Sequence, residues 1–95
     1  MSDESDDGEP AELPIDGELD LHTFRPDEVA ELVGDYLDEC RRRGIFEIRI
    51  VHGKGTGVLK RVVWEWLRGH PYVEDFRLGE TGEGGGGVTV VRLKE

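Results

Sequence analysis

Asp20 and His22 form a pair whose residue types and spacing suit chemistry. They lie two positions apart in the alternating segment 18–22, so in a strand both side chains project from the same face. A carboxylate in that place orients the imidazole ring and raises its basicity. The pair therefore predicts general acid/base catalysis on a phosphodiester.

A glycine-rich turn, HGKGTG at residues 52–57, predicts a site for an anion. Its glycines allow backbone amide hydrogens to approach an anion, and the helix expected directly after it adds partial positive charge from its dipole. The turn is not a Walker A loop, since no glycine stands five residues before Gly53, and we therefore set aside nucleoside triphosphate hydrolysis. The predicted phosphate-binding residues of this segment are Gly53, Lys54, Gly55, Thr56, Gly57, Lys60 and Arg61.

A second glycine-rich run, at residues 82–87, has two interpretations. Five of its six residues are glycine, and by itself such a run predicts only a flexible hairpin turn. Beside a site at the strand ends, a loop without side chains would admit the bulky backbone of a polymer. Gly85 and Gly87 are therefore further candidates for binding.

A predicted α/β fold with the element order βαβαββ positions these segments. Alternation of apolar and polar residues indicates strands with one wet face, and apolar residues at helical spacing after Pro26 and after Gly57 indicate two amphipathic helices. The predicted strands are residues 18–22, 45–51, 72–78 and 88–93, and the predicted helices are residues 26–43 and 58–69.

The connections predict how these elements assemble. Two βαβ crossovers make the first three strands parallel, and a closing hairpin makes the fourth antiparallel. We expect a two-layer sandwich in which a mixed four-stranded sheet carries both helices on one face. Since the carboxyl ends of parallel strands share an edge, His22 and His52 should lie near each other, and His52 is the third candidate catalytic residue.

The two tryptophans of the second helix have different expected places. Trp66 falls on the apolar stripe of the helix and is predicted to lie in the core. Trp64 falls off the stripe, so it is the one aromatic residue considered for contact with a partner.

Charge is distributed unevenly along the 95 residues, whose formal net charge is −10. Residues 1–20 hold nine of the 22 acidic residues and none of the 12 basic ones, so residues 21–95 carry a net charge of −1. A near-neutral domain can present a local basic patch, so a polyanionic partner is not excluded. We expect a disordered, acidic tail at residues 1–17 and one domain at residues 18–95. The tail is expected to be solubilising, and the alternative is that it competes with a ligand for the basic patch.

The sequence gives no sign of a membrane protein or of a disulfide framework. No apolar stretch approaches the roughly 18 residues needed to span a bilayer, and the N-terminus is acidic where a secretory signal is basic and then apolar. Cys40 is the only cysteine, too few for a disulfide or a zinc cluster, and it falls on an apolar helical stripe. We expect a cytoplasmic protein with Cys40 in its core.

Three segments together resemble the signatures of the Smr (small MutS-related) domain family. LDLH at residues 19–22, HGKGTGVLK at residues 52–60 and GGGGVTVV at residues 84–91 match, in order and spacing, the family motifs LDLHG, HGxGxGxLR and GGxGxTxV. The resemblance covers about residues 18–93. Thr23 stands where the family prefers glycine, and Lys60 stands where it usually has arginine, which keeps the charge but loses the bidentate fork.

This resemblance implies a fold like the C-terminal domain of translation initiation factor three and an endonuclease that nicks DNA or cleaves RNA. On this basis Asp20 and His22 would serve the chemistry, and the backbone would be held by His52, Gly53, Lys54, Gly55 and Lys60. The alternatives are a non-catalytic module that binds nucleic acid through the same turn and, from the acidic charge, a protein-interaction domain. The residues leave open a divalent metal cofactor, Mg²⁺ or Mn²⁺, the choice between DNA and RNA, and the oligomeric state.

Overall fold

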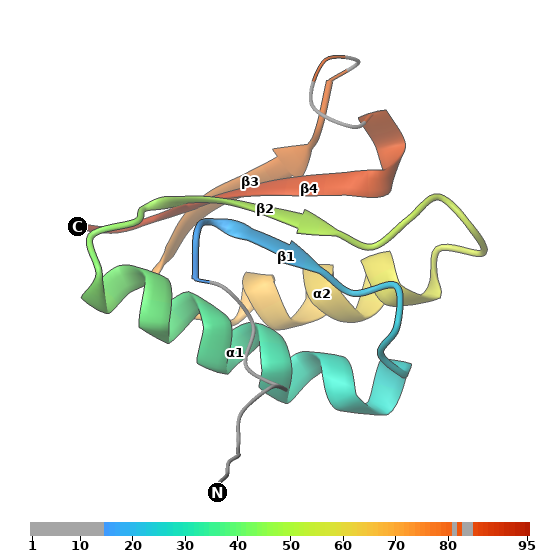
Figure 1. The fold of residues 1–95 in the computed structure, drawn as a ribbon, viewed down its shortest axis with the longest axis horizontal. Coiled ribbons are helices and arrows are strands. Elements are labelled where there is room, and N and C mark those ends of the chain that lie inside the picture. The colour runs from blue at the N-terminus through green and yellow to red at the C-terminus, as the bar shows by residue number, and fades with distance from the viewer. Residues whose placement is uncertain (1–14, 81, 83–84) are drawn as a thin grey trace, which may run out of the picture.

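The computed structural model describes residues 15–80, 82 and 85–95, which form two layers (Figure 1). One layer is a four-stranded sheet and the other consists of two helices, which lie on the same face of the sheet. The element order and the two-layer architecture predicted from the sequence are confirmed. The strands are β1 (Glu18–Asp20), β2 (Glu47–Val51), β3 (Val73–Leu78) and β4 (Val88–Leu93), the helices are α1 (Pro26–Arg42) and α2 (Val58–Arg68), and a 3-10 turn, η2 (Gly85–Gly87), precedes β4.

The sheet is mixed, in the spatial order β1-β2-β4-β3. β1 pairs in parallel with β2, with Asp20 opposite Val51, and β4 pairs antiparallel with both β2 and β3. The predicted strand directions are therefore confirmed, whereas the insertion of β4 between β2 and β3 is a feature that the sequence analysis did not specify. As a result, the beginning of β4 lies at the same edge of the sheet as the ends of β1 and β2.

The core fills the space between the sheet and the helices. Alternate strand residues such as Ile48 and Ile50 face the helices and are fully buried, and each such side chain contributes roughly 1.5–3 kcal/mol to stability. Cys40 is also fully buried, as predicted. No helix in the described part of the chain has the length and apolar character needed to cross a bilayer.

α1 and α2 approach each other closely at Gly34. A Cβ atom at this position would lie 2.9 Å from Cζ2 of Trp66, so only glycine leaves room for the indole. A glycine inside a helix costs about 1 kcal/mol relative to alanine, a cost that the closer packing offsets here. Trp66 packs against the core, in agreement with its place on the apolar stripe.

Several element boundaries differ from the predicted ones by one or two residues. α1 ends at Arg42 instead of residue 43, and Gly44, with a φ of +77°, turns the chain away from the helix. β1 ends at Asp20 instead of residue 22, because the Asp20 side chain accepts a hydrogen bond from the His22 backbone amide and forms a local turn. β2 begins at residue 47 instead of 45, and β3 begins at residue 73 instead of 72.

The described part of the chain begins within the segment expected to be a tail. Residues 1–14 of that segment lie outside the described residues. Ile15 packs against the core, and the Gly17 backbone amide donates a hydrogen bond to the Tyr36 hydroxyl at 3.1 Å. The Gly17 carbonyl accepts one from the Arg49 amide at 2.7 Å, so contacts with the domain extend to residue 15.

Candidate functional site

The three glycine- and histidine-containing segments lie side by side at one edge of the sheet. β1 leads into His22, β2 leads into the turn at residues 52–57, and η2 leads into β4 from the same edge. In Figure 1 the β2–α2 turn projects from this edge, at the end of the molecule opposite the C-terminus. The proximity predicted for the first two segments is thus present, and the strand order adds the third.

Asp20 and His22 form a solvent-exposed pair. The His22 Nδ1 atom lies 2.8 Å from Asp20 Oδ1. Because a carboxylate only accepts hydrogen bonds, Nδ1 carries the proton and is the donor of this hydrogen bond. The His22 backbone amide donates to the same oxygen at 3.0 Å, and this bond, followed by that of the ring, lowers the pKa of the Asp20 carboxyl. With side chains 72% and 52% exposed for His22 and Asp20, the remaining ring nitrogen, Nε2, is left for a substrate.

His52 has a different environment from His22. It is only 6% exposed, Nδ1 donates to the Gly53 carbonyl at 3.0 Å, and Nε2 accepts from the Thr89 hydroxyl at 2.8 Å. Burial lowers the pKa of the imidazole, so the ring is held neutral with its proton on Nδ1. Since both ring nitrogens are engaged, this environment favours a positioning role over the catalytic role expected from the sequence.

The Thr89 hydroxyl links His52 to α2. It accepts a hydrogen bond from Trp64 Nε1 at 2.8 Å while it donates to His52, so a continuous chain of hydrogen bonds runs from α2 through β4 to the end of β2. Thr89 is fully buried, and both of its polar contacts are satisfied within the protein. The chain fixes the ring of His52 and, through it, the Gly53 carbonyl.

The two glycine-rich segments are in direct contact. The Gly87 carbonyl accepts hydrogen bonds from the backbone amides of His52, at 3.0 Å, and Gly53, at 2.9 Å. A Cβ atom at Gly87 would lie 3.4 Å from the Gly53 backbone and from Cγ of Lys54, and one at Gly85 would lie 3.9 Å from Lys54 Nζ. Lys54 therefore extends over η2, and its ammonium group is delivered to the shared edge.

The N-terminus of α2 has features that favour an anion, and the N-terminus of α1 does not. The first turn of α1 contains Asp27 and Glu28, and the Glu28 side chain accepts a hydrogen bond from the Arg25 backbone amide at 3.0 Å. The N-cap residue of α2 is Gly57, which has no side chain to cap the first amides, and the first turn of the helix contains no acidic residue. Uncapped amides at a helix start, together with the helix dipole, favour a negatively charged ligand.

A pocket of about 410 Å³ lies between the segment that follows β1 and the start of α2. Its residues come from both sides of the site and are Phe24, Pro26, His52, Gly55, Thr56, Gly57, Val58 and Leu59. Gly55 and Thr56 are exposed at its rim, which is therefore not filled by packed side chains. The edge can receive a group the size of a phosphate with its attached sugar.

The candidate residues do not form a set of protein ligands for a divalent metal. Asp20 and His22 contact each other, but His52 is committed to Gly53 and Thr89 and cannot act as a third ligand. Within residues 15–80, 82 and 85–95 no three histidine, cysteine or acidic side chains gather in a way that could hold a metal. No chemical step is therefore assigned to a metal held by these residues.

Comparison with known proteins agrees with this geometry. Residues 19–94 match the model of the Smr domain, a range that includes all three motifs and, apart from Glu18, all four strands. The chain belongs to the Smr family. It is 49% identical over 80 residues to Endonuclease MutS2 of Clostridium botulinum (strain 657 / Type Ba4) and 45% identical over 80 residues to Endonuclease MutS2 of Clostridium tetani. Each alignment covers 84% of this chain and 10% of the relative, so the Smr domain spans about a tenth of the length of these proteins.

Solved structures of Smr proteins share its fold. The crystal structure of the Smr domain of Thermus thermophilus MutS2 superposes with a TM-score of 0.79 at 42% identity, covering 82% of this chain and 98% of that one. YdaL, a stand-alone small MutS-related protein from Escherichia coli, gives the same TM-score at 22% identity and covers 90% of this chain and 70% of that one, which shows agreement in fold alone.

Two residues of this Smr domain belong to the site although the sequence analysis did not select them. Thr89 is the threonine of the GGxGxTxV motif and a polar residue on the helix-facing side of β4, where Val91 and Leu93 are buried, and these two signals could have revealed it. Trp64 was considered only for contact with a partner. Its bond to Thr89 and its edge-to-face packing on Phe76, at 5.0 Å, also make it part of the support of the site.

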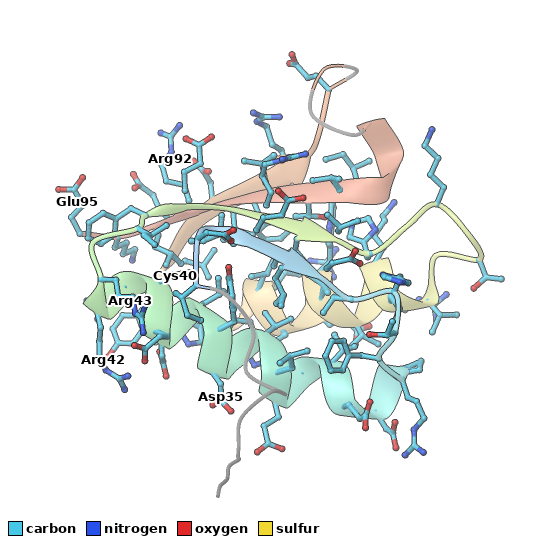
Figure 2. All side chains as sticks on the ribbon, in the orientation of Figure 1. Asp35, Cys40, Arg42, Arg43, Arg92 and Glu95 are labelled. Atoms are coloured by element: carbon cyan, nitrogen blue, oxygen red, sulfur yellow. The ribbon has the colours of Figure 1, made fainter. Side chains whose placement is uncertain are left out.

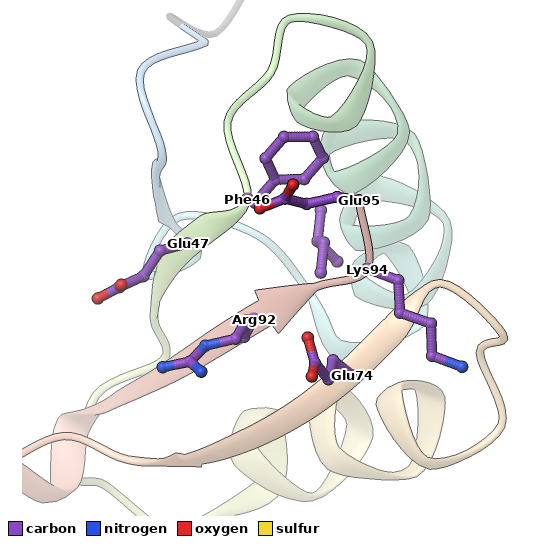
Figure 3. A pocket seen from close by; sticks show the side chains of 7 residues that line it. Phe46, Glu47, Glu74, Arg92, Lys94 and Glu95 are labelled. Atoms are coloured by element: carbon purple, nitrogen blue, oxygen red, sulfur yellow. The ribbon is translucent and has the colours of Figure 1, made fainter.

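A second pocket of the Smr domain, of about 600 Å³, lies at the opposite edge of the sheet (Figure 3). Figure 3 shows it between the start of β2 and the C-terminal end of the chain. Three glutamates and two basic residues surround it, namely Glu47, Glu74, Glu95, Arg92 and Lys94. It contains none of the three motifs and lacks a histidine or a glycine-rich turn, so its larger volume does not make it the functional site.

Proposed function

We propose that this Smr domain cleaves phosphodiester bonds in nucleic acid at the edge formed by the three motifs. The observation that carries the proposal is the exposed Asp20–His22 pair, joined at 2.8 Å, at the same edge as the uncapped start of α2. A phosphate bound by the amides of the turn would have an oriented imidazole beside it. The MutS2 relatives are named endonucleases, which supports the same reaction class.

In this reaction His22 acts first as the general base and then as the general acid. Asp20 accepts a hydrogen bond from Nδ1, which keeps the ring proton on that atom. Nε2 therefore takes a proton from the attacking hydroxyl, which is water or, in RNA, a neighbouring 2′-hydroxyl. The oxygen of that hydroxyl forms a bond to phosphorus, the bond from phosphorus to the leaving oxygen breaks, and the protonated imidazole returns its proton to the leaving group. The charge of the imidazolium is stabilised by the Asp20 carboxylate.

The binding groups of the proposed site are the glycine turn and its cations. Amides of residues 54–57 approach the phosphate oxygens, whereas the Gly53 amide already donates to the Gly87 carbonyl. Lys54 and Lys60 supply positive charge. Gly85 and Gly87 leave the edge free of side chains beside Lys54. His52 keeps the turn in place through the Gly53 carbonyl and does not exchange protons with the substrate.

A second candidate is a module that binds nucleic acid without cleaving it. It is favoured by the imbalance of the site, which offers many groups for binding a phosphate and a single exposed imidazole for catalysis. Both candidates use the same edge and the same partner, DNA or RNA, and differ only in whether the Asp20–His22 pair acts on the bound phosphate.

Purified protein incubated with supercoiled plasmid and with structured RNA, each with and without Mg²⁺ or Mn²⁺, tests the proposal. His22→Ala should strongly lower the cleavage rate and Asp20→Asn should lower it less, while Asp27→Asn, which changes an exposed carboxylate on α1, should not. An unreduced cleavage rate in both site variants would remove the catalytic assignment. Salt-sensitive binding without cleavage would support the binding module, and absence of binding at low salt would contradict both candidates and favour a protein-interaction domain.

A further inference from the structure

One face of α2 carries cations that continue away from the glycine turn. Lys60, Arg61 and Arg68 share this face with Trp64, because residues three, four, seven and eight positions apart fall on one side of a helix. Together with Gly57 they line a pocket of about 300 Å³. We call Arg61, Trp64 and Arg68 the α2 strip, since Lys60 already belongs to the proposed phosphate site.

The cations of this face differ from most other arginines of the domain in having no acidic partner. Arg42 and Arg43 pair with Glu39, and Arg25 pairs with Asp27. In the part of the chain that the structure describes, Lys60, Arg61 and Arg68 form no ion pair, and Lys60 instead places its ammonium 5.3 Å above the ring of Trp64. Unpaired cations gathered on one face favour a negatively charged partner.

Trp64 gives the face a rigid wall. Its Nε1 donates to the buried Thr89 hydroxyl at 2.8 Å, and its ring packs edge-to-face on Phe76. These contacts fix the indole, so the basic side chains on both sides flank a surface of defined shape. An aromatic wall between cations is suited to the sugar and phosphate units of a nucleic-acid strand.

We infer that the α2 strip binds the backbone of the nucleic-acid strand as it leaves the glycine turn. This inference rests on the proposed function, in which one phosphate occupies the turn at the start of α2. Arg68 lies about 12 Å further along the helix axis than Lys60, because each helical residue advances by about 1.5 Å. The strip therefore extends the binding surface by more than two helical turns.

Arginine at both ends of the strip favours phosphate as the ligand. Its planar guanidinium binds phosphate oxygens in a bidentate manner, which the ammonium of lysine cannot do. The attraction is local, since the chain as a whole carries a net charge of −10 and would repel a polyanion. The orientation of this face, and not the overall charge, directs the strand.

The dependence of binding on salt measures how many phosphates the strip contacts. We would titrate a fluorescein-labelled DNA duplex and the corresponding single strand with the full chain at several salt concentrations. In the variant Arg61→Gln/Arg68→Gln, the slope of log K against log[salt] should become shallower by about 1.8 for the duplex or about 1.4 for the single strand, and affinity at 0.1 M salt should fall at least about tenfold. Arg42→Gln/Arg43→Gln removes the same charge from the C-terminal end of α1, where Figure 2 labels both residues, and should leave the slope unchanged.

A variant that is expected to strengthen binding completes the test. Glu65 lies within four residues of both Arg61 and Arg68 on α2, so Glu65→Gln removes a negative charge beside the strip and should tighten binding. An unchanged slope in Arg61→Gln/Arg68→Gln, or an equal loss in Arg42→Gln/Arg43→Gln, would overturn the inference while leaving the glycine-turn site in place. Failure of the unsubstituted protein to bind either probe would instead overturn the proposed function, and the inference with it.

Discussion

The Thr89 hydroxyl and His52 Nε2 are joined by a buried hydrogen bond of 2.8 Å that ties the start of β4 to the turn that follows β2. Trp64 donates to the same hydroxyl from α2, and His52 passes the constraint on to the Gly53 carbonyl. Three elements thus hold one turn. The conformation of the glycine-rich segment therefore depends on Thr89, a fully buried residue of β4.

Thr89→Val should destabilise the domain more than Thr89→Ser, although valine is closer to threonine in volume. Valine leaves both the indole N–H of Trp64 and Nε2 of His52 without a partner, and each buried unsatisfied group costs roughly 1–3 kcal/mol. Serine keeps the hydroxyl and loses one methyl group, which costs about 1 kcal/mol. Urea unfolding measures both, and a Thr89→Val protein as stable as the serine variant would contradict the hydrogen-bonded chain.

The free energy of unfolding should rise with pH through the range in which an exposed histidine loses its proton. Burial lowers the pKa of His52 in the folded protein, so near the unfolded pKa of about 6.5 the unfolded chain binds more protons than the folded one. This part of the stability is present above that pKa and is lost as the pH falls below it. The positive charge of Lys60 acts in the same direction.

Urea unfolding of the unsubstituted protein and of His52→Gln at pH 5.5 and pH 7.5 tests the assignment. The difference between the two pH values should shrink in His52→Gln, because glutamine does not titrate. His22→Gln, which replaces an exposed histidine, serves as the matched control and should retain the difference. The same shrinkage in both variants would show that burial of His52 is not its source.

The sequence predicted the strands and helices because each has a clear periodicity. The alternation in residues 45–51 and the helical spacing after Pro26 and Gly57 each correspond to an observed element, with ends displaced by two residues or fewer. The ends are less predictable because local side-chain bonds decide them. The bond from the His22 amide to Asp20, which ends β1 early, has no counterpart in the apolar pattern.

The composition of the site was less predictable than its location. Motif order and parallel strands placed Asp20, His22 and the turn at one edge, and the structure has them there. The difference between an exposed His22 and a buried His52 depends on β4, whose insertion beside β2 brings Thr89 to His52. Periodicity within a segment carries no information about such a pairing between distant segments.

Gly57→Ala should destabilise the domain by roughly 1–2 kcal/mol. Gly57 precedes α2 with a φ of +84°, in the left-handed region where a Cβ atom is strained even though no other atom lies within 4 Å of it. Gly69 ends the same helix with a φ of −97° and equally open surroundings, so Gly69→Ala should instead be neutral or stabilising by up to about 1 kcal/mol. Thermal unfolding of the two variants separates backbone strain from a general effect of alanine. Equal melting temperatures would be inconsistent with backbone strain at residue 57.

His22→Ala should reduce the rate of phosphodiester cleavage by roughly 10²–10⁴-fold and leave the affinity for the uncleaved nucleic acid unchanged. The imidazole is 72% exposed and, among the residues that the structure describes, bonds only to Asp20, so its removal does not disturb the turn proposed to bind the phosphate. Asp20→Asn should give a smaller loss of rate, because an asparagine oxygen still accepts a hydrogen bond from Nδ1 but no longer stabilises the imidazolium with a full charge. Single-turnover cleavage measured together with equilibrium binding separates the two effects. A loss of affinity in His22→Ala that equals the loss of rate would indicate that His22 binds the substrate and does not transfer its proton.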